Sequence, residues 1–138
     1  MERSPFLLDS SAILTLLEDE GGADRVAEVI RTEKTFLPWP VLLEVHYISH
    51  QEEGPAEADR RYALLKKLPC EVLWQLEESV LLTAAHFKAK NKISLADALI
   101  AAYARSSGAI LLHKDPELEA LSEHLGLEAL PYKGSKPR

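Results

Sequence analysis

The chain has 138 residues, of which 46% are hydrophobic and 28% are charged, and these values exclude an intrinsically disordered chain. A chain of this length is expected to form one domain with a single core. The net charge of -6 excludes a protein that holds nucleic acid through a wide basic face, so any contact with nucleic acid has to be local.

In chain order, the first half of the sequence predicts two strands and four helices. The pair Ser10–Ser11 offers a cap for the first helix, and Pro40 suits the first turn of the third. Breaks in the pattern fall at Gly21–Gly22 and at Gly54–Pro55. Between these signals, apolar residues recur at helical spacing or form short continuous runs. The expected elements occupy residues 6–8, 12–17, 26–32, 35–37, 41–51 and 56–68.

The second half continues the alternation of strands and helices. Pro69 and Gly108 each end a helical pattern, and a short apolar run follows each of them. The expected elements occupy residues 71–74, 77–90, 95–105, 110–112, 117–124 and 128–130. Such alternation predicts an α/β domain with a mainly parallel sheet covered on both faces. We expect one domain over residues 1–132 and a loose tail over residues 133–138.

Four acidic residues stand in settings that favour a functional site. Asp9 directly follows the first predicted strand, and Asp115 follows the strand at 110–112 after two residues. Ligands of open parallel sheets usually bind beyond the carboxyl ends of the strands, so the two carboxylates converge if these strands are neighbours. Glu44 and Asp97 are each the only acid in an otherwise apolar helical stretch.

Each of these acids also has an ordinary structural explanation. Ser94 and Asp97 have the spacing of a capping box, and Asp9 is able to cap the following helix. Glu44 lies in the first turns of a helix, where negative charge is favourable, and Asp115 precedes a proline as a turn residue does. The functional interpretation therefore depends on the four residues jointly.

The joint pattern favours a divalent cation. A buried carboxylate is costly unless a proton, a basic partner or a metal ion neutralises it, and four acids in one place cannot easily share the first two. Ligands that are all oxygen select magnesium or manganese over zinc. Such ions lower the pKa of a bound water and are able to polarise a bound phosphate.

This pattern resembles the PIN-domain family, and especially the small VapC-type ribonuclease toxins of bacterial toxin–antitoxin pairs. The resemblance covers nearly the whole chain and is most specific over residues 93–104. The other matching segments are residues 7–13, 40–45 and 110–115. The sequence departs from the family at His113, where the family usually has Ser or Thr, and we expect this histidine to contact the site indirectly at most.

The resemblance implies a three-layer PIN-like fold, with a parallel sheet of four or five strands flanked by helices. It also implies a homodimer, an inhibitory antitoxin partner, and hydrolysis of RNA phosphodiesters with Mg²⁺ or Mn²⁺. Carried over to this chain, Asp9, Asp97 and Asp115 would be ligands of the metal, directly or through water. Glu44 would be either a further ligand or a base that orients water.

Other conspicuous residues are expected to be structural. Lys114 is more easily explained as a solvated lysine than as a phosphate ligand, and Trp39 as a packing residue than as a platform for a base. The basic residues of two helices could guide RNA, but charges on an exposed face are usually only solubilising. These residues are Arg60, Arg61, Lys66, Lys67, Lys88, Lys90 and Lys92.

Other functions fit the sequence less well. A haloacid-dehalogenase-type phosphotransferase needs a second acid two residues after the first, where Ser11 stands, and a receiver domain would not need Glu44 and Asp97. The serious alternative is a catalytically silent PIN-like module that binds protein or RNA. Cys70 is the single cysteine and no secretory signal pattern is visible, so we expect a cytoplasmic protein. No apolar run is long enough to predict a membrane role.

Overall fold

Five short strands form one sheet in the computed structural model, which describes residues 3–132. The strands are β1 (Phe6–Leu8), β2 (Thr35–Pro38), β3 (Glu71–Leu73), β4 (Ile110–His113) and β5 (Leu127–Ala129). Their order across the sheet is β3-β2-β1-β4-β5, and every pairing is parallel. The predicted α/β fold with a parallel sheet is therefore confirmed.

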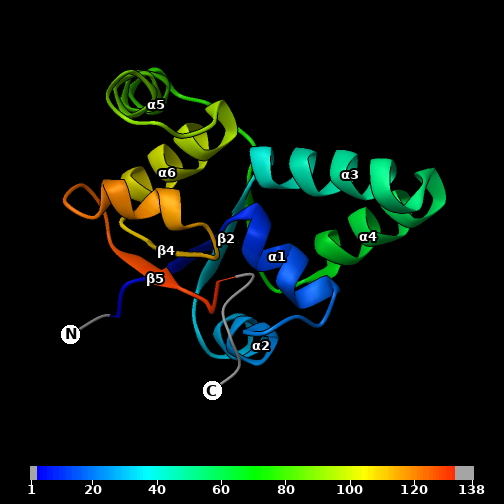
Figure 1. The fold of residues 1–138 in the computed structure, drawn as a ribbon. Helices are drawn as coiled ribbons and strands as arrows, with labels where there is room; N and C mark the ends of the chain where they lie inside the picture. Colours follow the sequence, from blue (N-terminus) through cyan, green and yellow to red (C-terminus); the bar gives the residue numbers. More distant parts are fainter. Residues whose placement is uncertain (1–2, 133–138) are drawn as a thin grey trace.

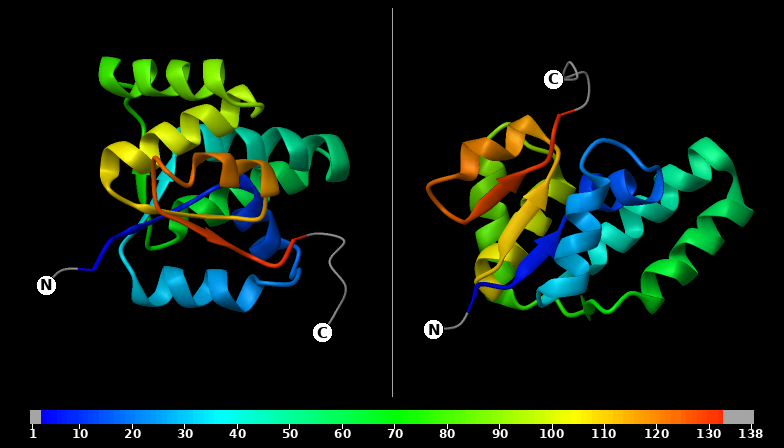
Figure 2. Two further views of the ribbon diagram at one scale, coloured as in Figure 1. Left: turned by 60° about the vertical axis from the view of Figure 1, so that its left-hand side comes forward. Right: turned by 90° about the horizontal axis from the view of Figure 1, so that it is seen from below.

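Helices pack in pairs around this sheet. They are α1 (Ser10–Leu17), α2 (Ala23–Thr32), α3 (Trp39–Glu53), α4 (Pro55–Lys67), α5 (Glu78–Lys90), α6 (Leu95–Ser107) and the 3-10 helix η1 (Pro116–Leu121). Figures 1 and 2 show the α5–α6 pair on one side of the sheet and α2 on the other, while α3 and α4 extend to one side as an antiparallel pair. The three layers predicted from the sequence are present.

The central strands are buried on both faces, and this explains why they are short continuous apolar runs. Leu7, Leu8, Leu111 and Leu112 are all fully buried. Strands that helices cover on both faces lose the alternation of polar and apolar residues that a half-exposed strand shows. The core therefore centres on β1 and β4, and it holds the carboxyl ends of these two strands in fixed positions.

The order of the strands reverses between β1 and β4. After β1 the chain proceeds outward through β2 to β3, then crosses back over the sheet through α5 and α6 to place β4 on the other side of β1. The register pairs Leu8 with Leu112. In an open parallel sheet such a reversal opens a crevice at the carboxyl ends of the strands, where ligands bind.

Of the caps that the sequence offered for α1, Asp9 rather than Ser10 or Ser11 is the N-cap, because its carboxylate accepts the Ala12 backbone N–H at 2.8 Å. One local prediction from the sequence was wrong. The helix expected over residues 117–124 is instead the six-residue 3-10 helix η1. The predicted loose tail over residues 133–138 lies outside the described residues. Within residues 3–132, no helix is long and apolar enough to cross a membrane.

Arg61 is also placed differently from the sequence interpretation, which had it as a solubilising charge. It is 7% exposed, and its guanidinium donates to Glu57 on its own helix, to Ser49 on α3 and to Glu18 at the end of α1. Arg60, its neighbour, pairs with the same Glu57 at the surface. Arg61 therefore connects the α3–α4 pair to α1, the helix that follows Asp9.

We expect Arg61→Ala to lower the free energy of unfolding by roughly 2 kcal/mol, because it removes charge-assisted hydrogen bonds and leaves the buried Ser49 hydroxyl without its partner. Urea unfolding monitored by circular dichroism measures this change. Arg60→Ala is the matched control and should change stability little, because exposed ion pairs contribute little. Equal losses in the two variants would contradict the assignment.

Candidate active site

Asp9 lies at the carboxyl end of β1, where the strand turns into α1. It is 2% exposed, and its carboxylate accepts the Ala12 N–H and the Ser11 hydroxyl, the latter at 2.7 and 2.9 Å to the two oxygens. Burial, together with the nearby charges of Asp115 and Glu44, raises the pKa of Asp9 from its usual 3.8 to about 7, although these hydrogen bonds lower it. The site therefore holds an acid that its surroundings only partly stabilise in the charged form.

Asp97 and Asp115 approach each other, although the first lies at the start of α6, before β4, and the second directly after β4. Asp115 follows β4 and caps η1, accepting the Glu117 N–H at 3.0 Å. Asp97 lies in the first turn of α6, where its backbone N–H donates to the Ser94 hydroxyl at 3.0 Å. Burial, the charge of Asp115 and a hydrogen bond between the two carboxyl groups raise the pKa of Asp97 to about 7.

Glu44 reaches the same place from α3. Its Oε1 accepts the Ser10 hydroxyl at 2.5 Å, a contact that joins α3 to the start of α1. Its charge contributes to the raised pKa of both Asp9 and Asp97. The four acids predicted from the sequence are thus brought close enough to interact electrostatically, from the ends of two strands and the N-terminal halves of two helices.

The structural explanations hold for Asp9, Asp97 and Asp115, whereas Glu44 lies beyond the first turn of α3, and they do not account for the cluster. Asp9 caps α1, Asp115 caps η1 and Ser94 caps α6. Asn or Ser would cap a helix without adding a charge. Here the caps of α1 and η1 are both aspartates, and the charge of Asp115 acts on Asp9. Four interacting carboxylates destabilise the fold unless protons or a cation neutralise some of their charge.

The cluster is not a closed set of metal ligands. Within residues 3–132, no group of three or more His, Cys, Asp or Glu side chains is positioned to surround an ion. The donors present are all carboxylate oxygens, and two of these acids have a pKa raised by crowding and burial. This donor set fits Mg²⁺, which keeps several waters and commonly takes only one or two carboxylates from a protein.

Two serines and a histidine fix the acids in place, and the sequence interpretation missed the serines. Ser11 donates to Asp9 and also accepts the Lys114 backbone N–H at 2.9 Å, so it joins the ends of β1 and β4. His113, fully buried, accepts the Asp115 N–H on Nδ1 at 3.1 Å. The two serines that follow Asp9 are visible in the sequence, where they also fit helix capping. Only their contacts with Glu44 and Lys114 show that they position the acids.

Lys114 is neither solvated nor available to a phosphate, so the expectation of a solvated lysine was wrong. Its side chain is 5% exposed, and its ammonium contacts a Glu20 carboxylate oxygen at 3.3 Å and the Gly21 carbonyl at 3.0 Å. Trp39 is a packing residue, as expected, and its indole N–H donates to the Tyr103 hydroxyl at 2.8 Å. Through its contacts with Glu20 and Gly21, Lys114 joins the segment after β4 to the turn between α1 and α2.

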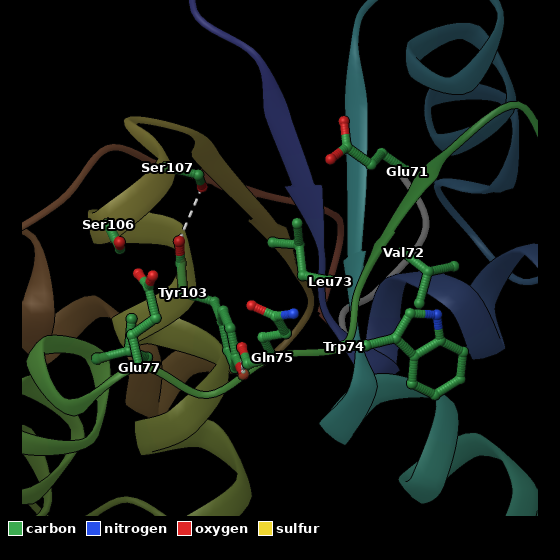
Figure 3. Close-up of a pocket in the computed structure, with 10 residues that line it drawn as sticks. Glu71, Val72, Leu73, Trp74, Gln75, Glu77, Tyr103, Ser106 and Ser107 are labelled. Atoms are coloured by element: carbon green, nitrogen blue, oxygen red, sulfur yellow. Dashed lines mark hydrogen bonds between the residues drawn. The ribbon is translucent and has the colours of Figure 1, made fainter.

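A cavity of about 330 Å³ lies away from the acids, between β3 with the residues that follow it and the end of α6. Figure 3 shows Tyr103, Ser106 and Glu77 on one side of it and Val72 to Trp74 on the other. The Tyr103 hydroxyl donates to the Gln75 carbonyl at 2.6 Å, which anchors the segment after β3. None of the four acids lines this cavity.

Comparison with known proteins places this geometry in a family. Residues 6–123 match the PIN domain model. No curated protein sequence matches the chain significantly. Solved structures with a similar fold include VapBC2 from Rickettsia felis bound to a fragment of promoter DNA, with a TM-score of 0.74 and 13% identity over 91% of this chain and 98% of that one.

Two further structures show the same fold. VapBC-1 from nontypeable Haemophilus influenzae has a TM-score of 0.70 and 20% identity, over 90% of this chain and 96% of that chain. PAE2754 from Pyrobaculum aerophilum has a TM-score of 0.64 and 22% identity, over 90% and 89%. Since the PIN domain model matches most of its length, the chain belongs to the PIN domain family.

Proposed function

We propose that this protein is a Mg²⁺- or Mn²⁺-dependent endoribonuclease and the toxin of a toxin–antitoxin pair. The observation that supports the activity is the meeting of Asp9, Glu44, Asp97 and Asp115 at the reversal of strand order. PIN domains are generally nucleases, and structures of similar fold are VapBC toxin–antitoxin complexes. The crowded carboxylates are explained if they bind a divalent cation, which would neutralise their charge while RNA is bound.

The four acids would have different roles in binding the cation and orienting water. Asp9, Asp97 and Asp115 would hold the cation, directly or through water, and Glu44 would hold it or orient the attacking water. When bound, the cation lowers the pKa of water and neutralises charge on the scissile phosphate. Ser11 and Ser10 keep Asp9 and Glu44 in place through the hydrogen bonds described above. We expect the products to end in a 5′-phosphate and a 3′-hydroxyl.

An exposed apolar patch beside the acids supports an antitoxin partner. Leu43 and Tyr47 lie one turn apart on α3 and are 56% and 43% exposed, and Glu44 stands next to Leu43. A helix or extended segment of a partner that covers these two side chains would also reach the acids. A basic side chain on that segment would neutralise them and inhibit cleavage, as Coulomb attraction favours.

The proposed homodimer has support from α5. This helix is the outermost one on its side of the sheet (Figure 1), and its Leu81 and Leu82 are 48% and 60% exposed. Glu78 begins the helix and Lys88 and Lys90 end it, so two antiparallel copies would place opposite charges together. Light scattering of the purified protein measures the number of chains in the assembly. The expected cytoplasmic location stays a prediction.

Cleavage of RNA by the purified protein tests the proposal. We expect mixed tRNA and rRNA to be cut with Mg²⁺ or Mn²⁺, and cutting to stop with EDTA and return when excess metal is added. Binding of Mn²⁺ by isothermal titration calorimetry gives a second readout that does not need the right RNA. Glu52→Gln, an exposed acid on the same helix as Glu44, is the control that should leave cutting unchanged.

Absence of activity would also be informative. If folded protein, free of any bound inhibitor, binds Mn²⁺ but cuts none of several RNAs, the endoribonuclease proposal is wrong. Failure to bind Mn²⁺ as well would favour a catalytically silent PIN-like binding module.

A further inference from the structure

His113 stands at the end of β4 and its ring contacts the chain on both sides. Its side chain is fully buried. Nδ1 accepts the backbone N–H of Asp115 at 3.1 Å, and Nε2 lies 2.9 Å from Oε2 of Glu119 on η1. The His113 carbonyl accepts the Leu130 N–H at 2.7 Å, which holds the backbone of this residue against the end of β5.

These contacts select one form of the ring. A ring nitrogen that accepts a hydrogen bond carries no proton, so Nδ1 is bare. The proton of the neutral ring is then on Nε2, where it donates to the Glu119 carboxylate. Glu119 thereby holds His113 in the tautomer that leaves Nδ1 free to accept from Asp115.

The result is a turn whose backbone is fixed by side chains. Two consecutive N–H groups follow β4: that of Lys114 donates to Ser11, and that of Asp115 donates to His113. The Asp115 carboxylate in turn accepts the Glu117 N–H and contacts Asp97. A Ser or Thr side chain accepts the N–H two residues on in the same way, but it is shorter and cannot also reach Glu119.

We propose that His113 is a positioning residue that fixes Asp115 in the site through the Asp115 backbone N–H, with Glu119 holding the ring. It performs with a ring nitrogen the task that a hydroxyl would perform at this place. His113 touches neither substrate nor metal. Its consequence for metal binding and cleavage rests on the proposed function, whereas its effect on the turn does not.

Two matched variants separate the contacts of the ring. His113→Asn keeps an acceptor for the Asp115 N–H, because an asparagine oxygen readily bonds the N–H two residues on. His113→Gln keeps a donor near Glu119 and loses the acceptor at the position of Nδ1. Both remove the ring and leave an amide in a buried place, so both should melt at lower temperature than the wild type, and by similar amounts.

We expect Mn²⁺ affinity to divide the two variants. His113→Asn should bind Mn²⁺ nearly as tightly as the wild type, and His113→Gln should bind it roughly 10- to 100-fold more weakly, as loss of a residue that orients a metal ligand typically does. Cleavage rates should follow the same order. A residue needed only for packing would weaken both variants alike, and that result, or the reverse order, would overturn the proposal.

Nuclear magnetic resonance of the metal-free protein decides the turn independently of any activity. The ¹⁵N shifts of the His113 ring should show a proton on Nε2 and none on Nδ1, and the Asp115 amide should shift in His113→Gln but much less in His113→Asn. A proton on Nδ1 would refute the positioning role. If the wild type binds no Mn²⁺ while these signals appear as expected, the proposed function fails and the inference about the turn holds.

Discussion

Asp97→Asn is expected to reduce RNA cleavage by about a hundred- to a thousand-fold, the loss typical when one group that stabilises transition-state charge is removed. Asn has nearly the same size as Asp, and Ser94 still accepts the backbone N–H of residue 97, so α6 keeps its start. The change removes one negative charge from a cluster that would hold the metal. It therefore tests the chemistry of the site with little change in its shape.

The measurement is the initial rate of cleavage at saturating Mg²⁺ or Mn²⁺, with the melting temperature of each variant as a check on folding. Asp9→Asn should lose activity to a similar extent, because it also removes one carboxylate from the site. It should stay folded, since an amide oxygen at this position still accepts the Ala12 N–H. Glu52→Gln should cut at the wild-type rate. If Asp97→Asn keeps more than a tenth of the activity while the metal dependence persists, Asp97 is not a ligand that the reaction needs.

Much of the fold could be predicted because its signals are local. The runs at β1 and β4 are apolar on both faces since helices cover both sides of the sheet, and glycine and proline mark where helices begin or end. Gly108 is an example, because it ends α6 in the left-handed conformation with φ of 64°, which glycine adopts at little cost. Both signals depend on residues next to one another in the chain.

The order of the strands and the partners of several side chains could not be predicted. No local feature states that β4 lies beside β1, and this pairing is what brings Asp115 to Asp9. Ser11 contacts Lys114, more than one hundred residues away, and Arg61 is buried only because α1, α3 and α4 meet there. The four acids were recognisable one by one, whereas their mutual repulsion depends on the assembled fold.

The pH dependence of stability should show the cost of charging the buried Asp9, to which burial contributes most and the repulsion from Asp115 and Glu44 adds. In the folded protein the pKa of Asp9 is about 7, against 3.8 for a solvated aspartate, so the folded state binds a proton that the unfolded state releases. The stabilising effect of that proton is complete below about pH 4 and is lost as the pH rises to about 7. Without metal, charged Asp9 therefore destabilises the native state at neutral pH.

Asp9→Asn removes this titration and keeps the cap of α1. In EDTA at pH 7.5 we expect it to be more stable than the wild type by up to about 4 kcal/mol, since one pKa unit corresponds to about 1.4 kcal/mol. The gain should shrink steadily toward pH 4, where both residues are neutral. Urea unfolding of the two proteins across this range measures the difference, in which the titrations of groups outside the acidic cluster cancel.

Metal should reduce the stability difference between the two proteins. A cation bound to the folded wild type stabilises it by about 2.7 kcal/mol at a free concentration one hundred times its Kd, and the variant, short of one carboxylate, should gain much less. At pH 7.5 Mn²⁺ should thus narrow or invert the advantage that Asp9→Asn has in EDTA. An advantage that stays constant with pH and with Mn²⁺ would mean that the Asp9 charge is compensated within the protein itself, and that the cluster does not require a cation.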